Sequence, residues 1–130
     1  MLNPRPGLGN PMAPVLVVDD DEDIAASIAD VLRTRGYLVE VAHDGQSALD
    51  VASHGGVTMV LLDWILPGAL SGGMLVRRLR ELCGENLPIV VVSADPVALT
   101  EARNADVTDY LPKPFQIDDL VHVVGHLART

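Results

Sequence analysis

Short apolar runs alternate along this chain with stretches in which apolar residues recur every three or four positions. Compact runs rich in β-branched residues are typical of strands, and the longer period is typical of helices. Three of the runs are continuously apolar, as expected for parallel strands that are buried on both faces. The runs predict five strands, at residues 15–19, 37–42, 57–63, 89–94 and 108–111.

The segments that follow these runs predict five helices. Gly36 can end the first helix, Asp44 can cap the second, and a short fourth helix follows Pro96. The fifth helix is expected from about residue 117 to residue 128. The side chains predicted to face the core are Ile24, Ile28, Val31 and Leu32; Ala48, Leu49 and Ala52; Met74, Leu75, Leu79 and Leu82; and Leu120, Val121, Val124 and Leu127.

Alternating strands and helices predict an α/β fold with a doubly wound, open parallel sheet. Such sheets place their sites outside the carboxyl ends of the strands, near a topological switch point. A length of 130 residues suits one domain with one hydrophobic core. Residues 1–13 are rich in Pro, Gly and Asn and lack periodicity, so we predict a flexible N-terminal tail followed by a domain over residues 14–130.

The overall charge and the cysteine content exclude several function classes. A net charge of −9 argues against direct binding to nucleic acid or to an anionic membrane. No apolar run approaches the roughly 20 residues that a membrane span needs. Cys83 is the single cysteine, which excludes an internal disulfide, and no secretory signal pattern is present, so we expect a cytoplasmic location. We interpret residues 77–80, which include three arginines, as a solvated helix face.

An acidic run ends the first predicted strand. Helix capping accounts for the residues at 21–23, because acidic side chains favour a helix N-terminus. Capping accounts poorly for Asp19 and Asp20, which lie at the strand end itself and would repel each other unless a cation lay between them. Mg²⁺ is commonly held by one or two carboxylates together with water and phosphate oxygens. Both capping and metal binding therefore remain open for this run.

Three further polar residues lie where later strands end. Asp63 can begin a turn before Pro67, or it can complete a cation site and act as a nucleophile toward phosphorus. Ser93 can cap the short helix or donate to a phosphoryl oxygen. Lys113 is the only lysine among nine basic residues, and a compact ammonium suits a narrow site that an arginine fork would not fit.

Four motifs together closely resemble the receiver domain of bacterial two-component response regulators. The resemblance covers about residues 14–128 and implies a flavodoxin-like (βα)₅ fold with strand order 2-1-3-4-5. The motifs are Val17-Val18-Asp19-Asp20, Leu62-Asp63-Trp64-Ile65-Leu66-Pro67, Val92-Ser93-Ala94 and Tyr110-Leu111-Pro112-Lys113-Pro114-Phe115.

The resemblance also implies the chemistry of the acidic residues. Asp63 would accept a phosphoryl group from a phosphohistidine on a sensor histidine kinase or a histidine phosphotransfer protein. Mg²⁺ would be bound directly by Asp20 and Asp63, largely through water by Asp19, and by the backbone carbonyl of Ile65. Self-phosphorylation and autodephosphorylation would both depend on Mg²⁺, so the chain is not expected to be an enzyme that acts on a separate substrate.

The same resemblance implies the parts of a switch. Ser93 and Lys113 would contact the phosphoryl oxygens, and the Lys113–Pro114 peptide bond would be cis. Tyr110 would swing inward when Ser93 moves toward the phosphoryl group, which changes a protein-binding surface. Trp64, beside the phosphoacceptor, is expected to be partly exposed.

The expected role is that of a stand-alone receiver, a monomer or weak dimer without an output domain, which either signals by contact with a downstream protein target or passes its phosphoryl group on to another histidine. The segment between Ser93 and Lys113 is shorter than is typical, so the fourth helix is expected to be short or shifted. That departure leaves open a second interpretation, a receiver-like interaction module that works without phosphorylation. A phosphatase acting on small substrates is a third, disfavoured because Ile65 stands where an acid/base carboxylate would be needed.

Overall fold

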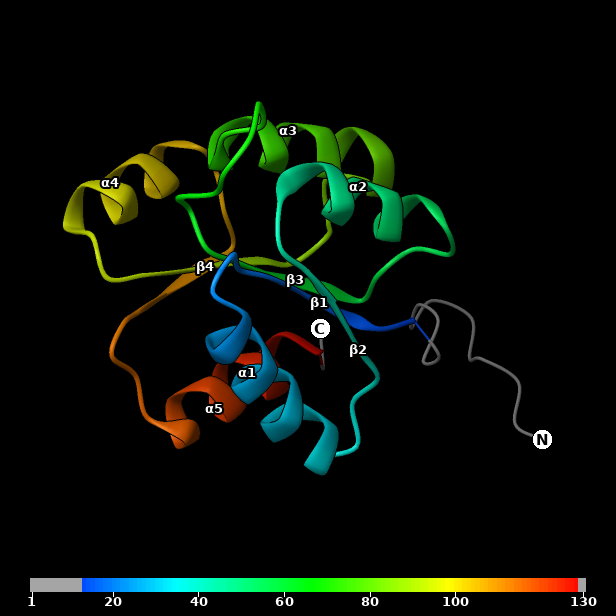
Figure 1. The fold of residues 1–130 in the computed structure, drawn as a ribbon, viewed down its shortest axis with the longest axis vertical. Helices are drawn as coiled ribbons and strands as arrows, with labels where there is room; N and C mark the ends of the chain where they lie inside the picture. The colour runs from blue at the N-terminus through cyan, green and yellow to red at the C-terminus, as the bar shows by residue number, and fades with distance from the viewer. Residues whose placement is uncertain (1–12, 129–130) are drawn as a thin grey trace.

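A computed structural model describes residues 13–128, in which five strands alternate with five helices (Figure 1). The predicted tail over residues 1–13 lies outside the described residues apart from Ala13, so the division at residue 14 remains a prediction. The strands are β1 (Val15–Val18), β2 (Val39–Ala42), β3 (Met59–Leu62), β4 (Ile89–Ser93) and β5 (Asp109–Pro112). The helices are α1 (Glu22–Thr34), α2 (Gly45–Ser53), α3 (Gly72–Cys83), α4 (Pro96–Asn104) and α5 (Ile117–Ala128).

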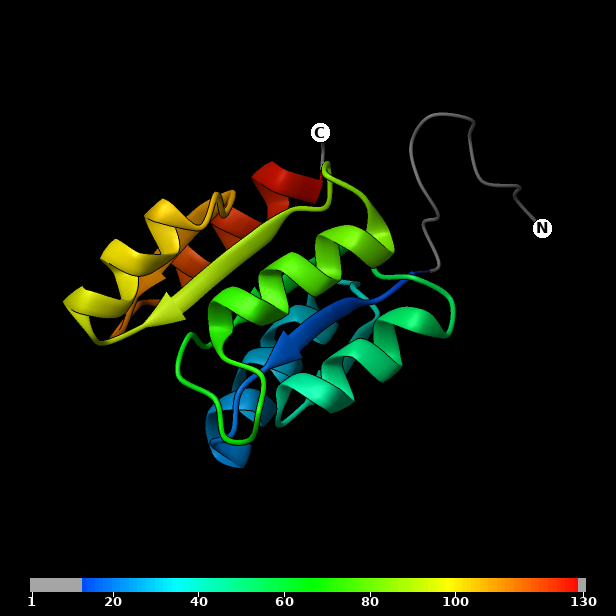
Figure 2. The ribbon, with the colours of Figure 1, turned by 90° about the horizontal axis from the view of Figure 1, so that it is seen from above.

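All strand pairs are parallel, and the order β2-β1-β3-β4-β5 confirms the predicted topology. Val18 pairs with both Ala42 and Leu62, so β1, β2 and β3 end at the same level. At the other side of the sheet, Ser93 pairs with Pro112. Figure 2 shows the strand arrows running toward one edge, where the segments that follow β1 and β3 lie close together.

Helices cover both faces of the sheet, with α1 and α5 on one face and α2, α3 and α4 on the other (Figure 1). Every residue of β1 and β3 is buried, as the continuously apolar runs predict. Alternate strand residues face opposite helix layers, so Leu16 and Val18 join one buried cluster, and Val15 and Val17 join the other. Among residues 13–128 no helix is both long enough and apolar enough to cross a membrane.

Two aspartates start helices as the sequence predicts. The Asp21 carboxylate accepts the backbone N–H groups of Asp23 and Ile24 at 3.0 and 3.1 Å and caps α1. The Asp44 carboxylate accepts the Ser47 N–H at 2.7 Å and caps α2. Each bond satisfies a backbone donor that the first helical turn leaves without an intrahelical partner.

The predicted inner face of α3 is partly wrong. Met74 and Leu82 are 45% and 48% exposed, whereas Leu75, Val76 and Leu79 are buried. The rotation of the helix follows from its start, because Gly72 lies directly against Trp64. A β-carbon built on Gly72 would lie 2.6 Å from the Trp64 carbonyl oxygen and 2.7 Å from ring atom Cδ2. Trp64 is itself only 8% exposed, so the expectation that it is partly exposed is wrong.

One arginine of the predicted solvated face, Arg80, makes structural hydrogen bonds to the backbone of other segments. Arg77 and Arg78 are exposed, but the Arg80 guanidinium donates to three backbone carbonyls. These belong to Glu85 and Leu87, at 2.8 and 3.0 Å, and to Asp106 at 3.0 Å. Asp106 has a left-handed φ of 61°, so Arg80 secures the connection before β5 at its most strained residue.

Candidate functional site

The hydrogen-bonding pattern of the sheet continues one residue past β1 and β3. The Asp63 N–H donates to the Val18 carbonyl at 2.8 Å, and the Asp19 N–H donates to the Ala42 carbonyl at 3.1 Å. Asp19 and Asp63 are thereby held side by side at the carboxyl edge of the sheet, beyond two fully buried strands. The acidic residues predicted at the strand ends therefore lie together at this edge of the sheet, and we call the place where they meet the acidic crevice.

Three carboxylates meet there. Asp19, Asp20 and Asp63 each offer an oxygen, and these oxygens all lie within 4.8 Å of one another. Asp19 is 2% exposed, whereas Asp20 is open to solvent and Asp63 is partly buried. One Asp19 oxygen accepts the Asp21 N–H at 2.9 Å, so the buried carboxylate is held in a fixed orientation.

Lys113 supplies the cation of the crevice. Its Nζ lies 3.0 Å from Asp19 Oδ2 and 3.6 Å from Asp63 Oδ2, and its side chain is 18% exposed. The Lys113 backbone N–H donates to the Ser93 carbonyl at 2.9 Å, which extends the β4–β5 ladder to the site. The Lys113–Pro114 peptide bond is cis, as the resemblance implies. The single lysine thus lies between two carboxylates.

The pKa values of the site follow from this crowding. Burial raises the pKa of Asp63, and the negative charges of Asp19 and Asp20 raise it further. The Lys113 ammonium and the Ile65 N–H, 3.3 Å from Asp63 Oδ1, oppose that rise without cancelling it. Burial lowers the pKa of Lys113, but the hydrogen bond to Asp19 and the charge of Asp63 outweigh burial, so its pKa is raised. Lys113 is therefore charged at neutral pH.

The donor set fits a hard divalent cation. Three carboxylates face one ammonium, which leaves the crevice with an excess of negative charge. The raised pKa of Asp63 shows that full ionisation is unfavourable without further positive charge. Carboxylate oxygens within 4.8 Å of one another, with Asp20 open to solvent, suit Mg²⁺, which takes oxygen ligands and usually keeps several waters. Asp19, Asp20 and Asp63 are the residues that could hold it.

Ser93 lies at the end of β4 and is 3% exposed. It does not cap α4, because Asp95 does: the Asp95 carboxylate accepts the Val97 N–H at 2.9 Å. The Ser93 hydroxyl oxygen instead accepts the Asp95 N–H at 3.2 Å. Ser93 is tied to Lys113 through the backbone, whereas Tyr110 lies farther back on β5, where it pairs with Val91.

One neighbour of the site is missing from the sequence-based prediction. The His43 ring nitrogen Nδ1 lies 2.9 Å from the backbone carbonyl oxygen of Asp19. The β1–β2 register could have revealed it, because His43 directly follows Ala42, the partner of Val18.

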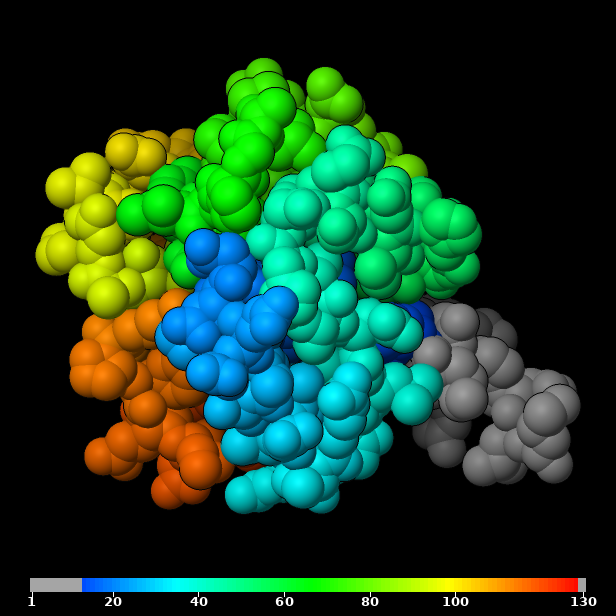
Figure 3. Space-filling view, in the orientation of Figure 1, coloured from blue at the N-terminus to red at the C-terminus, as the bar shows by residue number. Residues whose placement is uncertain are grey.

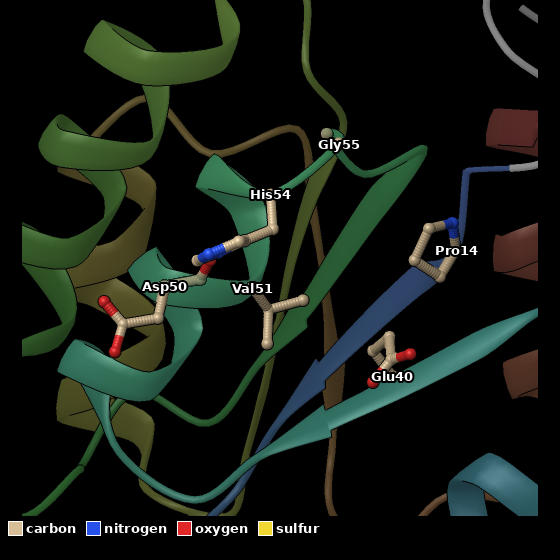
Figure 4. Close-up of a pocket in the computed structure, with 7 residues that line it drawn as sticks. Pro14, Glu40, Asp50, Val51, His54 and Gly55 are labelled. Atoms are coloured by element: carbon tan, nitrogen blue, oxygen red, sulfur yellow. The ribbon is translucent and has the colours of Figure 1, made fainter.

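Two hollows on the surface have different relations to this site. A largely apolar groove of about 620 Å³ lies between α1 and α5 and includes Lys113, Phe115 and Ile117 in its lining. A second cavity, of about 410 Å³, is lined by Pro14, Glu40 and residues of α2. Figure 4 shows that its residues come from the amino-terminal side of β1, from β2, and from the end of α2 and the segment after it. Only the first hollow borders the acidic crevice.

Segments from different parts of the chain meet around the crevice on one face of the molecule. Figure 3 shows the start of α1 in blue, the segment after β3 in green and the segment after β5 in orange on that face. Asp20 is exposed and Asp63 is only partly buried, so the site is accessible from outside the molecule, although Asp19 itself is buried.

Comparisons with known proteins agree with this geometry. Response regulator MprA of Mycobacterium avium is 41% identical over 117 residues, which cover 88% of this chain and 50% of that protein. The receiver domain of NtrX from Brucella abortus is 30% identical, with a TM-score of 0.83 over 89% of this chain and 98% of that one. Chemotaxis protein CheY4 of Vibrio cholerae is 28% identical, with a TM-score of 0.80 and coverage of 89% and 98%.

The family assignment rests on a match along most of the chain. Residues 15–125 match the sequence pattern of the response regulator receiver domain, which includes all of the acidic residues and the lysine of the crevice. This chain therefore belongs to the response regulator receiver domain family.

Proposed function

We propose that Asp63 is a phosphoacceptor that takes its phosphoryl group from a phosphohistidine. The observation that carries the proposal is the position of Lys113, whose ammonium lies 3.0 Å from Asp19 and 3.6 Å from Asp63 in a crevice of three carboxylates. An Asp63 oxygen attacks phosphorus, the new O–P bond forms, and the P–N bond to the donor imidazole breaks. Because negative charge spreads over the phosphoryl oxygens during this transfer, a fixed cation beside the acceptor favours it.

We propose a separate role in phosphoryl transfer for each residue of the crevice. Lys113 offsets charge on the phosphoryl oxygens, and the Ile65 N–H holds one Asp63 oxygen so that the carboxylate keeps its direction. Asp19 and Asp20, with Asp63, would hold Mg²⁺, and the Ile65 backbone carbonyl is the further ligand that we propose. When bound, Mg²⁺ supplies additional positive charge at the phosphoryl oxygens.

We further propose that Ser93 and Tyr110 form the switch. Ser93 is buried at the end of β4, and its hydroxyl can turn from the Asp95 N–H to donate to a phosphoryl oxygen. That movement vacates space toward β5, which the Tyr110 ring can enter. The resulting change in surface between α4 and β5 would be read by a downstream protein.

The phosphohistidine donor is a sensor histidine kinase or a histidine phosphotransfer protein of a two-component system, and we place the encounter in the cytoplasm. The apolar groove between α1 and α5 is the surface that we propose for it, since Lys113 lines the groove and Ile117 is 54% exposed beside it. Ile117→Asp should slow transfer from a phosphohistidine domain and leave transfer from acetyl phosphate unchanged. Equal slowing with both donors would contradict this assignment.

The chain spans about half the length of the curated relatives that it matches, MprA and YkoG of Bacillus subtilis. We propose that residues 14–130 form a receiver unit. Its downstream target would bind a surface of this unit that lies outside the acidic crevice. The alternative function is that of an interaction module that works without phosphorylation. A module of this kind should show no change in Trp64 fluorescence when a mimic of the phosphoryl group is added.

Fluorescence of Trp64 tests the proposal, because this buried indole directly follows Asp63. Mg²⁺ and then beryllofluoride, a mimic of the phosphoryl group, are titrated while emission is followed, with Asp63→Asn as the matched control. We expect a saturable, Mg²⁺-dependent change in the parent and none with beryllofluoride in Asp63→Asn. An identical response in both proteins would contradict a phosphoacceptor role for Asp63.

A further inference from the structure

Helix α4 has less buried apolar surface than its neighbour α3. Its only buried residues are Ala98 and Ala102, whereas α3 buries Leu75, Val76 and Leu79. Hydrophobic stabilisation is roughly proportional to the apolar area removed from water, so two alanines hold a helix weakly. Polar links from α4 to the rest of the molecule therefore have more influence on its position than they would in α3.

Two such links leave α4, one from each side of the helix. On the side of α3, the Trp64 indole N–H donates to Glu101 Oε2 at 3.0 Å. On the side of β5, the Arg103 Nε donates to the Tyr110 hydroxyl at 3.1 Å, and the guanidinium carbon lies 5.3 Å from the centre of the Tyr110 ring. Figure 1 shows α4 at the end of its layer, beside α3, so no helix covers its outer side.

The two partners differ in how firmly they are held. Trp64 is 8% exposed and its ring and carbonyl press against Gly72, so it cannot move without moving α3. Tyr110 is only partly buried and packs at the margin of the buried cluster. Glu101 is therefore bonded to Trp64, which is held rigidly, whereas Arg103 is bonded to Tyr110, which has more freedom to move.

We propose that Arg103 is a positioning residue that holds Tyr110 in its unphosphorylated position, and that Glu101 positions Arg103 by anchoring α4 to Trp64. This inference rests on the proposed function, in which Tyr110 moves when Asp63 is occupied. A hydrogen bond present in one conformation and lost in the other favours the first conformation by its own free energy. Arg103 therefore opposes the switch, and its removal favours the occupied conformation.

The experiment compares beryllofluoride midpoints, in saturating Mg²⁺, for the parent, Arg103→Ala, Tyr110→Phe and the double variant. Arg77→Ala, which removes an exposed arginine of α3, is the matched control. We expect the midpoint to fall about three- to tenfold in Arg103→Ala and to stay unchanged in Arg77→Ala. In Tyr110→Phe, removal of Arg103 should have a smaller effect than in the parent, because the hydrogen bond is already lost.

Glu101 is tested without metal or mimic as well. Amide hydrogen exchange in α4 should be faster in Glu101→Ala than in Glu101→Gln, which keeps an acceptor for the Trp64 indole. The midpoint shift caused by Glu101→Ala should largely vanish when Arg103 is already alanine, since Glu101 acts through Arg103.

The outcomes separate this inference from the proposed function. A parent that does not respond to beryllofluoride overturns both. A parent that responds, with Arg103→Ala and Arg77→Ala at the same midpoint, overturns only the role of Arg103. Lower melting temperatures without a change of midpoint would show that Arg103 and Glu101 serve stability alone, which also overturns it.

Discussion

Adjacent glycines at the start of α3 should respond to alanine in opposite directions. A β-carbon on Gly72 would lie 2.6 Å from the Trp64 carbonyl oxygen and 2.7 and 2.8 Å from two atoms of its indole ring. A β-carbon on Gly73 would meet the same ring at 3.8 Å, which is ordinary van der Waals contact. Neither glycine has a positive φ, so only the space beside Trp64 separates the two substitutions.

The expected magnitudes follow from these distances. At Gly72 the nearest atom belongs to the backbone, so either α3 or the segment after β3 must shift. Overpacking of this kind typically costs about 1–3 kcal/mol. At Gly73 the methyl group fits, and alanine reduces the conformational freedom of the unfolded chain, which stabilises a protein by about 0.4–1 kcal/mol.

Chemical denaturation, followed by far-ultraviolet circular dichroism, measures both effects against the parent. Gly72→Ala should lower the free energy of unfolding and also change Trp64 emission, since the indole must move. Gly73→Ala should raise the free energy of unfolding and leave the emission unchanged. If Gly72→Ala were as stable as Gly73→Ala, the close packing of α3 on Trp64 would be refuted, and with it the rigidity assigned to Trp64 as an anchor.

Four further predictions concern the site and its support. Lys113→Arg keeps the charge but not the slim stem, so phosphorylation by acetyl phosphate should become about tenfold slower; an unchanged rate would argue against a narrow site. Ile65 is 60% exposed and apolar, and Ile65→Asn should speed loss of the phosphoryl group by allowing a polar side chain to assist water. Equal rates of phosphoryl loss in Ile65→Asn and the parent would show that Ile65 does not slow this reaction. The pKa of Asp63 is higher in the folded protein than in the unfolded chain. The folded protein therefore loses stability as the pH rises from the unfolded pKa through the folded pKa, because the carboxylate ionises more easily in the unfolded chain. Without metal, Asp63→Asn should therefore melt at a higher temperature than the parent at pH 7 but not at acidic pH below both values. Arg80→Ala loses donors to three carbonyls and should cost about 1–3 kcal/mol in urea denaturation, whereas Arg77→Ala should cost little.

Much of the architecture is predictable because strand burial and helix periodicity agree. The continuous apolar runs of β1 and β3 correctly indicate strands covered on both faces, and their ends locate Asp19 and Asp63. The isolated lysine also predicts a cationic position that the structure places between those two carboxylates. These features depend on local pattern and on the geometry common to parallel sheets.

The errors arise where a contact between distant segments decides the outcome. Periodicity alone predicts Met74 in the core, but the contact between Gly72 and Trp64 determines how α3 is rotated. The role of Arg80 depends on carbonyls up to 26 residues away, which no local pattern reveals. The links of α4 to Trp64 and Tyr110 escape prediction for the same reason, since single polar pairs leave no periodic signal.

Intact-mass analysis after incubation with acetyl phosphate and Mg²⁺ tests the central claim most directly. The parent should gain the mass of one phosphoryl group, and peptide mapping should place it on Asp63 as an acyl phosphate that hydroxylamine removes. Omission of Mg²⁺ and the Asp63→Asn variant should each abolish the gain. A parent that gains no mass, or an Asp63→Asn protein that gains as much as the parent, would contradict the assignment of Asp63 as the phosphoacceptor.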